Sequence, residues 1–585
     1  MNPDADVIIV GSGAGGGIAA YVLANAGLSV LLLEKGPWAT PANFGDDELR
    51  FGDRNFIDQD ALIEPRTFRD SAEQGDHVYV GPVLDVSRCV GGGSVHYGAV
   101  CFRFRPEDFR AHRTWGDLPG ADIADWPLSD EELDPANPNS IWAYYRKVES
   151  LIGVAGGQMA GAAQPGAPVP GSLQERTDTY PMPGHPPNYP CHLFELAAAR
   201  MGLHPYPTPV ALNNGSYDGR PGCTYCGFCS GYACPIDAKG DTRVTALDKG
   251  LATGNLTIVP DTFVRSLDVQ SGRAAGVHTV NSDGSDGYYA AGRAVVLAAS
   301  TVETPRLVLL SDLGGTVNSD LVGRYLMTHH FPAGVGVFEE RVDYWRGFWS
   351  MRCFDDWYFG PAGMAAPAFG WGNLQTVGPS GGARSAFGTG GLISMAKTVG
   401  WGATHKGGMQ SLFGHMQFLS IIGQDPPVPT NTVDLDPTVK DVYGAPVARI
   451  TYSHHPNDVA VQAAAAPLIA GILAEMGATS TQAVMPLGVG TAIPQGGDQE
   501  PYHRGVMRGV PDTVGGLVNH QMGTMRMGAD ESTSVVDPSG RLRGLPNVYV
   551  ADGSVFPTSG GYNPTLTIQA MAWRTADLMV EALRK

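Results

Sequence analysis

The sequence predicts an α/β fold that begins with a nucleotide-binding unit, and three observations lead to this prediction. An apolar strand, a glycine-rich turn, an alanine-rich helix and a second apolar strand follow one another within residues 6–36. The 585 residues are enough for two or three domains with large cores. The 78 glycines and 44 prolines are spread among apolar runs, which is typical of many turns rather than of disorder.

The first apolar strand leads directly into a glycine motif. VIIV at residues 7–10 is a continuous apolar run, as a buried parallel strand requires. The motif G-x-G-x-x-G follows with Gly11, Gly13 and Gly16, and a helix is expected over residues 15–26. The first glycine permits a tight turn, the second lets the backbone approach a pyrophosphate, and the third lets helix and strand pack closely. The N-terminus of the helix would offer its N–H groups to the phosphates.

The second strand supplies an acidic residue at the expected place. LSVLLLE at residues 28–34 ends in Glu34, which lies 18 residues after Gly16. A carboxylate at this position can accept hydrogen bonds from the hydroxyls of a ribose. Because the strands, the turn, the helix and the acid are in register, the sequence predicts a dinucleotide site. The motif alone leaves both FAD and NAD open.

Composition excludes several other classes of partner. The formal net charge of −19 argues against nucleic acids and anionic membranes. No apolar run reaches 18 residues, so no transmembrane segment is predicted, and the bland stretch at residues 463–474 is expected to be a buried or half-buried helix. The first residues carry no basic segment, so no signal peptide is expected. We therefore expect a cytoplasmic location, unless a partner carries the chain across a membrane.

A cluster of cysteines is the second motif that carries chemistry. Four of the eight cysteines fall within 12 residues: Cys223, Cys226, Cys229 and Cys234. Their spacing, C-x2-C-x2-C-x4-C-P, is one residue longer than the bacterial ferredoxin pattern. An iron–sulfur cluster is one interpretation. Reduced structural thiols, a disulfide and a zinc site are the alternatives.

Three further segments resemble the glucose–methanol–choline (GMC) family of flavoprotein oxidoreductases. RCVGGGSVHYGAVCFRFRPEDF at residues 88–109 is similar to the first signature of the family. ASTVETPRLVLLSDLG at residues 299–314 is similar to the second signature, and residues 519–576 match the C-terminal block. The segments stand in the family's order, and the resemblance implies that the dinucleotide is FAD.

The resemblance also implies how the chain is divided. A Rossmann-like FAD-binding domain would be discontinuous, and an α+β substrate-binding domain with an antiparallel sheet would be inserted into it. The FAD-binding segments are predicted at residues 1–37, 80–110, 191–330 and 505–585, with the cysteine-rich loop at 222–240. The substrate-binding segments are predicted at residues 111–190 and 331–504.

The first signature and its surroundings supply further expected cofactor contacts. By resemblance, Gly92, Gly93 and Ser94 contact FAD. His96 stands where some members of the family carry a covalent histidyl–flavin bond. We expect a histidine that packs on the flavin without that bond, and the covalent bond is the alternative.

The C-terminal block supplies the remaining cofactor contacts that the resemblance implies. Asp552 resembles the family's cofactor-contacting acid, with a cap at the end of a strand as the alternative. Pro564 and Thr565 open a helix whose N-terminus would face the flavin and stabilise negative charge there.

The same block implies a catalytic pair. H-x-x-G-T places a histidine at position 520, and N-P places an asparagine at position 563. Oxidation of an alcohol requires removal of the hydroxyl proton, and an unperturbed histidine has a pKa of about 6.5, close to the working pH. We expect His520 to be the general base and Asn563 to orient the substrate oxygen.

The resemblance implies oxidation of a hydroxyl group to a carbonyl, and a sugar or glycoside is the expected substrate. An oxidase that uses oxygen on an aromatic, long-chain or steroid alcohol is one alternative. A non-catalytic flavin electron-transfer protein and an NAD-linked dehydrogenase are others.

The cysteine loop bears on the electron acceptor. It resembles that of membrane-linked sugar dehydrogenases of the family, which would imply a 3Fe-4S or 4Fe-4S cluster, a cytochrome or other electron-acceptor protein, and a small escort subunit. Long-chain alcohol oxidases of the family have a similar loop to which iron is not generally ascribed. A dehydrogenase is favoured over an oxidase.

Two clusters remain open between function and structure. Five tryptophans lie within residues 345–401: Trp345, Trp349, Trp357, Trp371 and Trp401. They would stack on a sugar or form the core of a sheet. His329 and His330 are expected to be structural.

Overall fold

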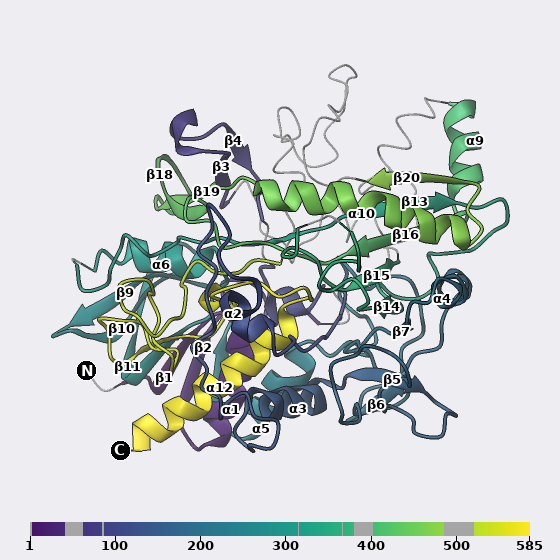
Figure 1. The fold of residues 1–585 in the computed structure, drawn as a ribbon. Helices are drawn as coiled ribbons and strands as arrows, with labels where there is room; N and C mark the ends of the chain where they lie inside the picture. Colours follow the sequence, from purple (N-terminus) through teal and green to yellow (C-terminus); the bar gives the residue numbers. More distant parts are fainter. Residues whose placement is uncertain are drawn as a thin grey trace.

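The computed structural model describes residues 3–40, 63–84, 87–313, 315–364, 367–378, 402–484 and 520–584. The fold is α/β, with one mixed sheet near the chain ends and one antiparallel sheet beyond it (Figure 1). The cysteine loop and the glycine motif both lie within the described residues. Trp401 lies outside them.

The first sheet has the strand order β8-β2-β1-β11-β10-β9, and β21 pairs with β11 on the side away from β1. Its strands are β1 Ala5–Val10, β2 Val30–Leu33, β8 Leu256–Val259, β9 Thr262–Gln270, β10 Arg273–Asn281, β11 Asp286–Leu297 and β21 Val548–Val550. β8, β2, β1, the end of β11 and β21 run parallel. Val7, Ile8 and Ile9 are fully buried, which confirms the expected buried parallel strand.

Helices from the two ends of the chain lie side by side on this sheet. α1 Ala14–Asn25 follows the glycine turn as predicted, and α12 Thr565–Arg584 lies against it (Figure 1). Ile18 and Leu23 share one core cluster with Ala572 and Met579. α3 Ile141–Ile152 packs on α12, α5 Asp248–Ala252 packs on α1 and β8, and α6 Glu303–Leu310 packs on β9. The nucleotide-binding unit is therefore complete only when the C-terminal helix is in place.

The second sheet is the expected antiparallel one. Its order is β20-β13-β16-β15-β14-β7, and the strands are β7 Tyr206–Pro207, β13 Ala333–Val337, β14 Arg352–Phe354, β15 Leu374–Val377, β16 Met416–Ile421 and β20 Ser480–Val484. α10 Pro456–Glu475 and α4 Tyr189–Arg200 cover it. Among the described helices, α10 alone has the length and apolar composition to cross a membrane, and its inner face packs on β13 and β20.

A third sheet joins distant segments in the order β18-β19-β3-β4. Its strands are β3 Arg66–Arg69, β4 Tyr79–Gly81, β18 Thr432–Lys440 and β19 Pro446–Thr451. Two small pairs remain: β5 Ala155–Met159 with β6 Met182–Gly184, and β12 His329–His330 with β17 Gly423–Gln424. The short helices are α2 Ala111–Trp115 and α9 Ala403–Leu412.

Candidate functional site

A cavity of about 470 Å³ opens where the carboxyl ends of β1, β2 and β11 meet the N-termini of α1 and α12. Ligands of open α/β sheets bind at the carboxyl ends of parallel strands. Most of the residues predicted from the sequence line this cavity: Gly11, Gly13, Glu34, Gly92, Gly93, Ser94, His96, His520, Asp552, Asn563, Pro564 and Thr565. Gly16 lies one turn into α1, where an added Cβ would stand 2.0 Å from the carbonyl oxygen of Gly11. Gly16 therefore has the predicted packing role.

Two glycine turns meet at the floor of the cavity. A Cβ built on Gly92 would lie 2.7 Å from the Cα of Gly13, so the turn Gly92–Ser94 rests directly on the start of α1. Gly13 precedes α1 and has no side chain to cap it. The N–H groups of the first turn of α1 are therefore left for a ligand, and a pyrophosphate suits them.

Glu34 closes the far end of the strand-turn-helix unit. Its Oε2 accepts hydrogen bonds from Ser12 N at 3.0 Å and Ser12 Oγ at 2.6 Å, and its Oε1 accepts from Gly36 N at 2.9 Å. Burial raises the pKa of this carboxyl, and these hydrogen bonds partly offset the rise. Ser12 Oγ also accepts from Gly91 N at 2.9 Å. Ser12, which the sequence motif leaves as an "x", thus ties the two glycine turns to the acid.

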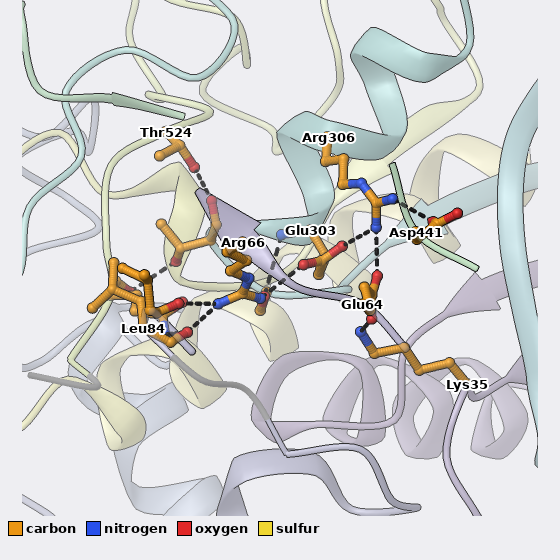
Figure 2. A network of polar contacts seen from close by, with 12 residues as sticks. Lys35, Glu64, Arg66, Leu84, Glu303, Arg306, Asp441 and Thr524 are labelled. Carbon is orange, nitrogen blue, oxygen red and sulfur yellow. Dashed lines mark hydrogen bonds and ion pairs between the residues drawn. The ribbon is translucent and has the colours of Figure 1, made fainter. Parts of the chain in front are cut away.

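A buried network of alternating charges continues from this end of the cavity (Figure 2). Six side chains form it: Lys35, Glu64, Arg66, Glu303, Arg306 and Asp441. Arg306 binds three carboxylates, and its contact with Asp441 measures 2.7 Å. Lys35, Glu303 and Arg306 line the cavity. The network joins the cavity wall to β3 and to the loop after β18, and its members among the described residues are three cations and three anions.

Asp552 and His96 lie on the cavity wall with protein partners of their own. Asp552 accepts hydrogen bonds from Ser554 N at 2.9 Å, Ser300 N at 3.1 Å and Thr304 Oγ1 at 2.6 Å. It therefore caps the turn after β21, as the alternative predicted, while it lines the cavity. His96 Nε2 is hydrogen-bonded to Ser87 Oγ. The contact of His96 with the flavin stays a prediction, with the covalent bond as its alternative.

His520 and Asn563, which are 43 positions apart, meet on the cavity wall. Asn563 Nδ2 lies 3.3 Å from His520 Nε2, and Asn563 Oδ1 accepts from Gln375 Nε2 at 2.8 Å. Removal from water lowers the pKa of His520 to about 4. α12 begins at Thr565, and Pro564 O accepts the first helical hydrogen bond from Ile568 N. Pro564 thus stands one position before the helix that it was expected to open.

His329, which the sequence predicts to be structural, is hydrogen-bonded to His520. Its Nδ1 lies 2.8 Å from His520 Nδ1, and its Nε2 lies 2.7 Å from the carbonyl oxygen of Gly560. His329 and His330 form β12, and successive side chains of a strand point to opposite faces. Recognition of a strand at these two positions would have shown that only one of the two histidines could face the site.

The four clustered cysteines do not form a metal site in the part of the chain that the structure describes. No group of three or more His, Cys, Asp or Glu side chains there is placed to hold a metal ion, and Cys223, Cys226, Cys229 and Cys234 are free thiols. The iron–sulfur prediction is therefore not supported, because the described thiols are not placed together as the ligands of such a cluster.

A buried lysine side chain holds the cysteine loop against the cavity. The buried Lys239 Nζ donates to the carbonyl oxygens of Cys229 at 2.7 Å, Tyr232 at 2.8 Å and Tyr97 at 3.0 Å. Ser230 and Gly231 of this loop line the cavity. Lys239 therefore fixes the loop beside the predicted cofactor site through hydrogen bonds to backbone carbonyl groups.

The tryptophan cluster divides between the two uses considered. Trp357 and Trp371 are buried in the core that packs under α10, as the sheet-core alternative predicted. Trp345 stacks on Phe413, at a centroid distance of 6.0 Å. Trp349 lines the cavity, as Phe331 does. One tryptophan of the described four is thus available to a ligand in the cavity.

Models of protein families match most of the chain. The model described as GMC oxidoreductase matches residues 78–331 with its N-terminal part and residues 427–572 with its C-terminal part. An FAD binding domain model matches residues 6–43. The glycine cradle, the uncapped helix and the acid after β2 suit this cofactor, and the protein is an FAD flavoprotein.

Curated relatives cover almost the whole chain. Paromamine 6'-oxidase of Streptomyces fradiae is 30% identical over 98% of this chain and 90% of its own length. Gluconate 2-dehydrogenase flavoprotein of Pantoea cypripedii is 27% identical over 99% of this chain and 94% of its own. The 2-methyl-1,2-propanediol dehydrogenase of Mycolicibacterium austroafricanum is 28% identical over 98% and 94%.

Solved structures agree on the fold. Pyridoxine 4-oxidase from Mesorbium loti superposes with a TM-score of 0.62 at 16% identity, over 98% of this chain and 99% of that one. A variant of the formate oxidase of Aspergillus oryzae RIB40 gives a TM-score of 0.63 at 16% identity, over 100% and 99%. With the family models, the relatives and the cavity taken together, the chain belongs to the GMC oxidoreductase family, whose members act on the hydroxyl groups of alcohols and sugars.

Proposed function

We propose that this protein oxidises a hydroxyl group of a sugar or glycoside to a carbonyl, with His520 as the general base. The contact of 3.3 Å between His520 Nε2 and Asn563 Nδ2 on the cavity wall carries the proposal. A substrate hydroxyl that enters between the two side chains can donate to the imidazole while its oxygen accepts from the amide. Bound FAD supplies the acceptor for the hydride of the carbinol carbon.

The residues around the pair divide the remaining work. The turn Gly11–Gly13 and the start of α1 would hold the pyrophosphate, and Glu34 the ribose. The N-terminus of α12 would favour negative charge on the reduced cofactor. Phe331 packs edge-on to His520, with ring centroids 5.4 Å apart, and keeps water from that side of the base.

The substrate class and the acceptor rest on the relatives. Two of them are named for sugars or sugar acids, gluconate 2-dehydrogenase flavoprotein and fructose dehydrogenase large subunit. Their names favour a dehydrogenase that passes electrons to a separate acceptor protein, with further subunits as partners. An oxidase is the second candidate, since 6'''-hydroxyparomomycin C oxidase and paromamine 6'-oxidase are comparably similar.

The first experiment is anaerobic reduction of the bound flavin by an alcohol panel. D-gluconate, D-fructose, paromamine and 2-methyl-1,2-propanediol are the probes, and bleaching of the flavin absorbance is the readout. We expect at least one probe to bleach the wild-type flavin and H520A to slow bleaching by about 10²–10⁴-fold, the usual contribution of a general base. An equal rate in H520A would remove His520 from the role. If no probe reduces the wild-type flavin, a non-catalytic flavin electron-transfer protein becomes the better description.

The electron acceptor is identified in a second experiment, in which the reduced flavin is reoxidised. Rapid reoxidation of the bleached flavin by oxygen would favour the oxidase. Slow reoxidation by oxygen with rapid reoxidation by a quinone would favour the dehydrogenase.

A further inference from the structure

The hydrogen bonds behind His520 end on a group that can only accept. The carbonyl oxygen of Gly560 lies 2.7 Å from His329 Nε2, so that nitrogen must carry a hydrogen. His329 is fully buried in β12. Burial and the neighbouring imidazoles of His520 and His330 lower its pKa well below the ordinary value, which keeps the ring neutral.

A neutral imidazole carries one N–H, so the position of that hydrogen on His329 decides which ring donates in the hydrogen bond between His329 and His520. With its hydrogen on Nε2, His329 has a lone pair on Nδ1. His520 Nδ1 lies 2.8 Å from His329 Nδ1 and must therefore donate a hydrogen to that lone pair. The two ring planes are nearly perpendicular, at 88°, with centroids 5.0 Å apart, and the rings meet through their two Nδ1 atoms, where the in-plane N–H and the in-plane lone pair can align. The neutral His520 then has its lone pair on Nε2, the nitrogen that faces Asn563.

The hydrogen bonds on the other side of His520, through Asn563 and Gln375, are consistent with a lone pair on His520 Nε2. Gln375 Nε2 donates to Asn563 Oδ1 at 2.8 Å, so Asn563 presents its Nδ2 group to His520 Nε2. An N–H group is matched to a lone pair at each step. The donor and acceptor pattern is therefore consistent from β15 through the catalytic pair to the Gly560 carbonyl.

We propose that His329 is a positioning residue, which fixes the tautomer of His520 so that Nε2 is the proton acceptor for the substrate. The inference rests on the proposed function of His520. In the proton transfer the O–H bond of the substrate breaks, its electron pair stays on oxygen, and an Nε2–H bond forms. The other tautomer would present an N–H to the hydroxyl and could not accept its proton.

The same contact stabilises the product of the transfer. Protonated His520 keeps its Nδ1–H on the neutral His329, and a hydrogen bond from a cation is shorter and stronger than a neutral one. Among the described residues, no carboxylate is hydrogen-bonded or ion-paired with His520; its polar partners are His329 and Asn563. The titratable neighbours are thus histidines, with His330 next along β12. His329 takes the orienting role that a carboxylate has in a Ser-His-Asp triad.

Two substitutions at one position separate orientation from packing. In H329N the amide oxygen can occupy the place of Nδ1 and accept from His520, whereas the contact with Gly560 is lost. In H329Q the amide nitrogen can reach Gly560, whereas the acceptor for His520 is lost. Both side chains are polar, uncharged amides that fit the space of a histidine. Flavin content and thermal unfolding midpoint report whether each variant is folded.

The tautomer is read directly and without substrate. In flavin-loaded protein labelled with nitrogen-15 histidine, the ring signals of His520 are those absent in H520A. We expect a protonated Nδ1 and an unprotonated Nε2 in the wild type at pH 7 and in H329N, and a mixed or reversed pattern in H329Q. A wild-type His520 that carries its hydrogen on Nε2 would overturn the proposal.

The kinetic readout uses the panel alcohol that reduces the wild-type flavin fastest. We expect H329Q to slow flavin reduction by about 10²-fold, at the lower end of what a general base contributes, and H329N to stay within about tenfold of wild type. Equal rates in the two variants would mean that only packing matters and would refute the inference. If no alcohol reduces the wild-type flavin, the proposed function fails, while the tautomer measurement still decides the role of His329.

Discussion

At the scale of single residues, uncharged surroundings set the basicity of His520. The ring lies among an imidazole, an amide and a phenyl ring, and removal from water lowers its pKa to about 4. A lowered pKa means that the neutral, proton-accepting form persists at acidic pH. His520 is therefore neutral, and able to accept a proton, at neutral and mildly acidic pH.

The pH dependence of kcat/KM should show this directly. Only neutral His520 accepts a proton, so the rate rises as pH increases through the pKa of about 4 and is level above roughly pH 5. N563D places a carboxylate beside Nε2, which stabilises the imidazolium and raises that pKa. We expect the acid limb of N563D to move to higher pH by one unit or more. N563A is the uncharged control, whose limb should stay near that of the wild type.

At the scale of elements, the contact between the Gly92–Ser94 turn and the start of α1 shapes the cofactor floor. A side chain at position 92 would overlap the backbone at Gly13, whereas a Cβ at Gly471, an exposed glycine of α10, meets nothing within 4 Å. Gly92 also has φ of +53°, which disfavours alanine further.

G92A should therefore lose FAD while G471A keeps it. The added methyl at position 92 must push the turn away from the helix N-terminus that would hold the pyrophosphate. We expect the ratio of flavin to protein absorbance to fall at least severalfold in G92A after purification and to be unchanged in G471A. Equal flavin content in the two variants would show that the close contact does not matter for the cofactor.

The charge network around Arg306 links three elements at the same end of the cavity. Burial alone would raise the pKa of Glu303, but the cations around it, Lys35 first and Arg306 next, hold that pKa well below its ordinary value. Both side chains of the pair Arg306 and Asp441 are almost completely buried. Charges of this kind are costly when one partner is removed.

R306A should destabilise the protein strongly, because Asp441 and Glu303 lose their shared cation. A buried ion pair that loses one partner costs about 3–5 kcal/mol of stability. The matched control is R200A, whose partner Glu475 forms an ion pair with 55% and 43% of the two side chains exposed. An exposed pair is worth about 1 kcal/mol or less. Urea unfolding of the two variants gives the comparison, and equal effects would contradict the role of burial.

At the scale of the whole molecule, sequence patterns predicted the elements that depend on neighbouring residues, such as a glycine turn or an apolar run. β1, α1 and β2 lie within two residues of the expected ranges, and α10 and α12 stand where their apolar runs predicted helices. The positions of His520 and Asn563 came from motif resemblance, and the fold brings the two within hydrogen-bond distance. Their chemical roles remain predictions.

Features that depend on tertiary contacts could not be predicted in the same way. His329 reaches His520 across 191 positions, through the pairing of β12 with β17. The spacing of the cysteines resembles a ligand pattern, but spacing does not fix where thiols point once Lys239 holds the loop by its carbonyls. Aromatic side chains likewise stack on a ligand or fill a core with equal ease, and only the sheet decides between them.

The pairing of β21 with β11 has a consequence for synthesis on the ribosome. β11 ends at Leu297, and β21, which covers its open edge, begins at Val548. At about 5–20 residues per second, roughly 13–50 s of translation separate the two strands. During that time the nascent chain carries an apolar strand edge and a nucleotide site without α12. Such edges attract other chains, so the yield of active protein in a cell depends on how well the half-made sheet is protected until translation ends.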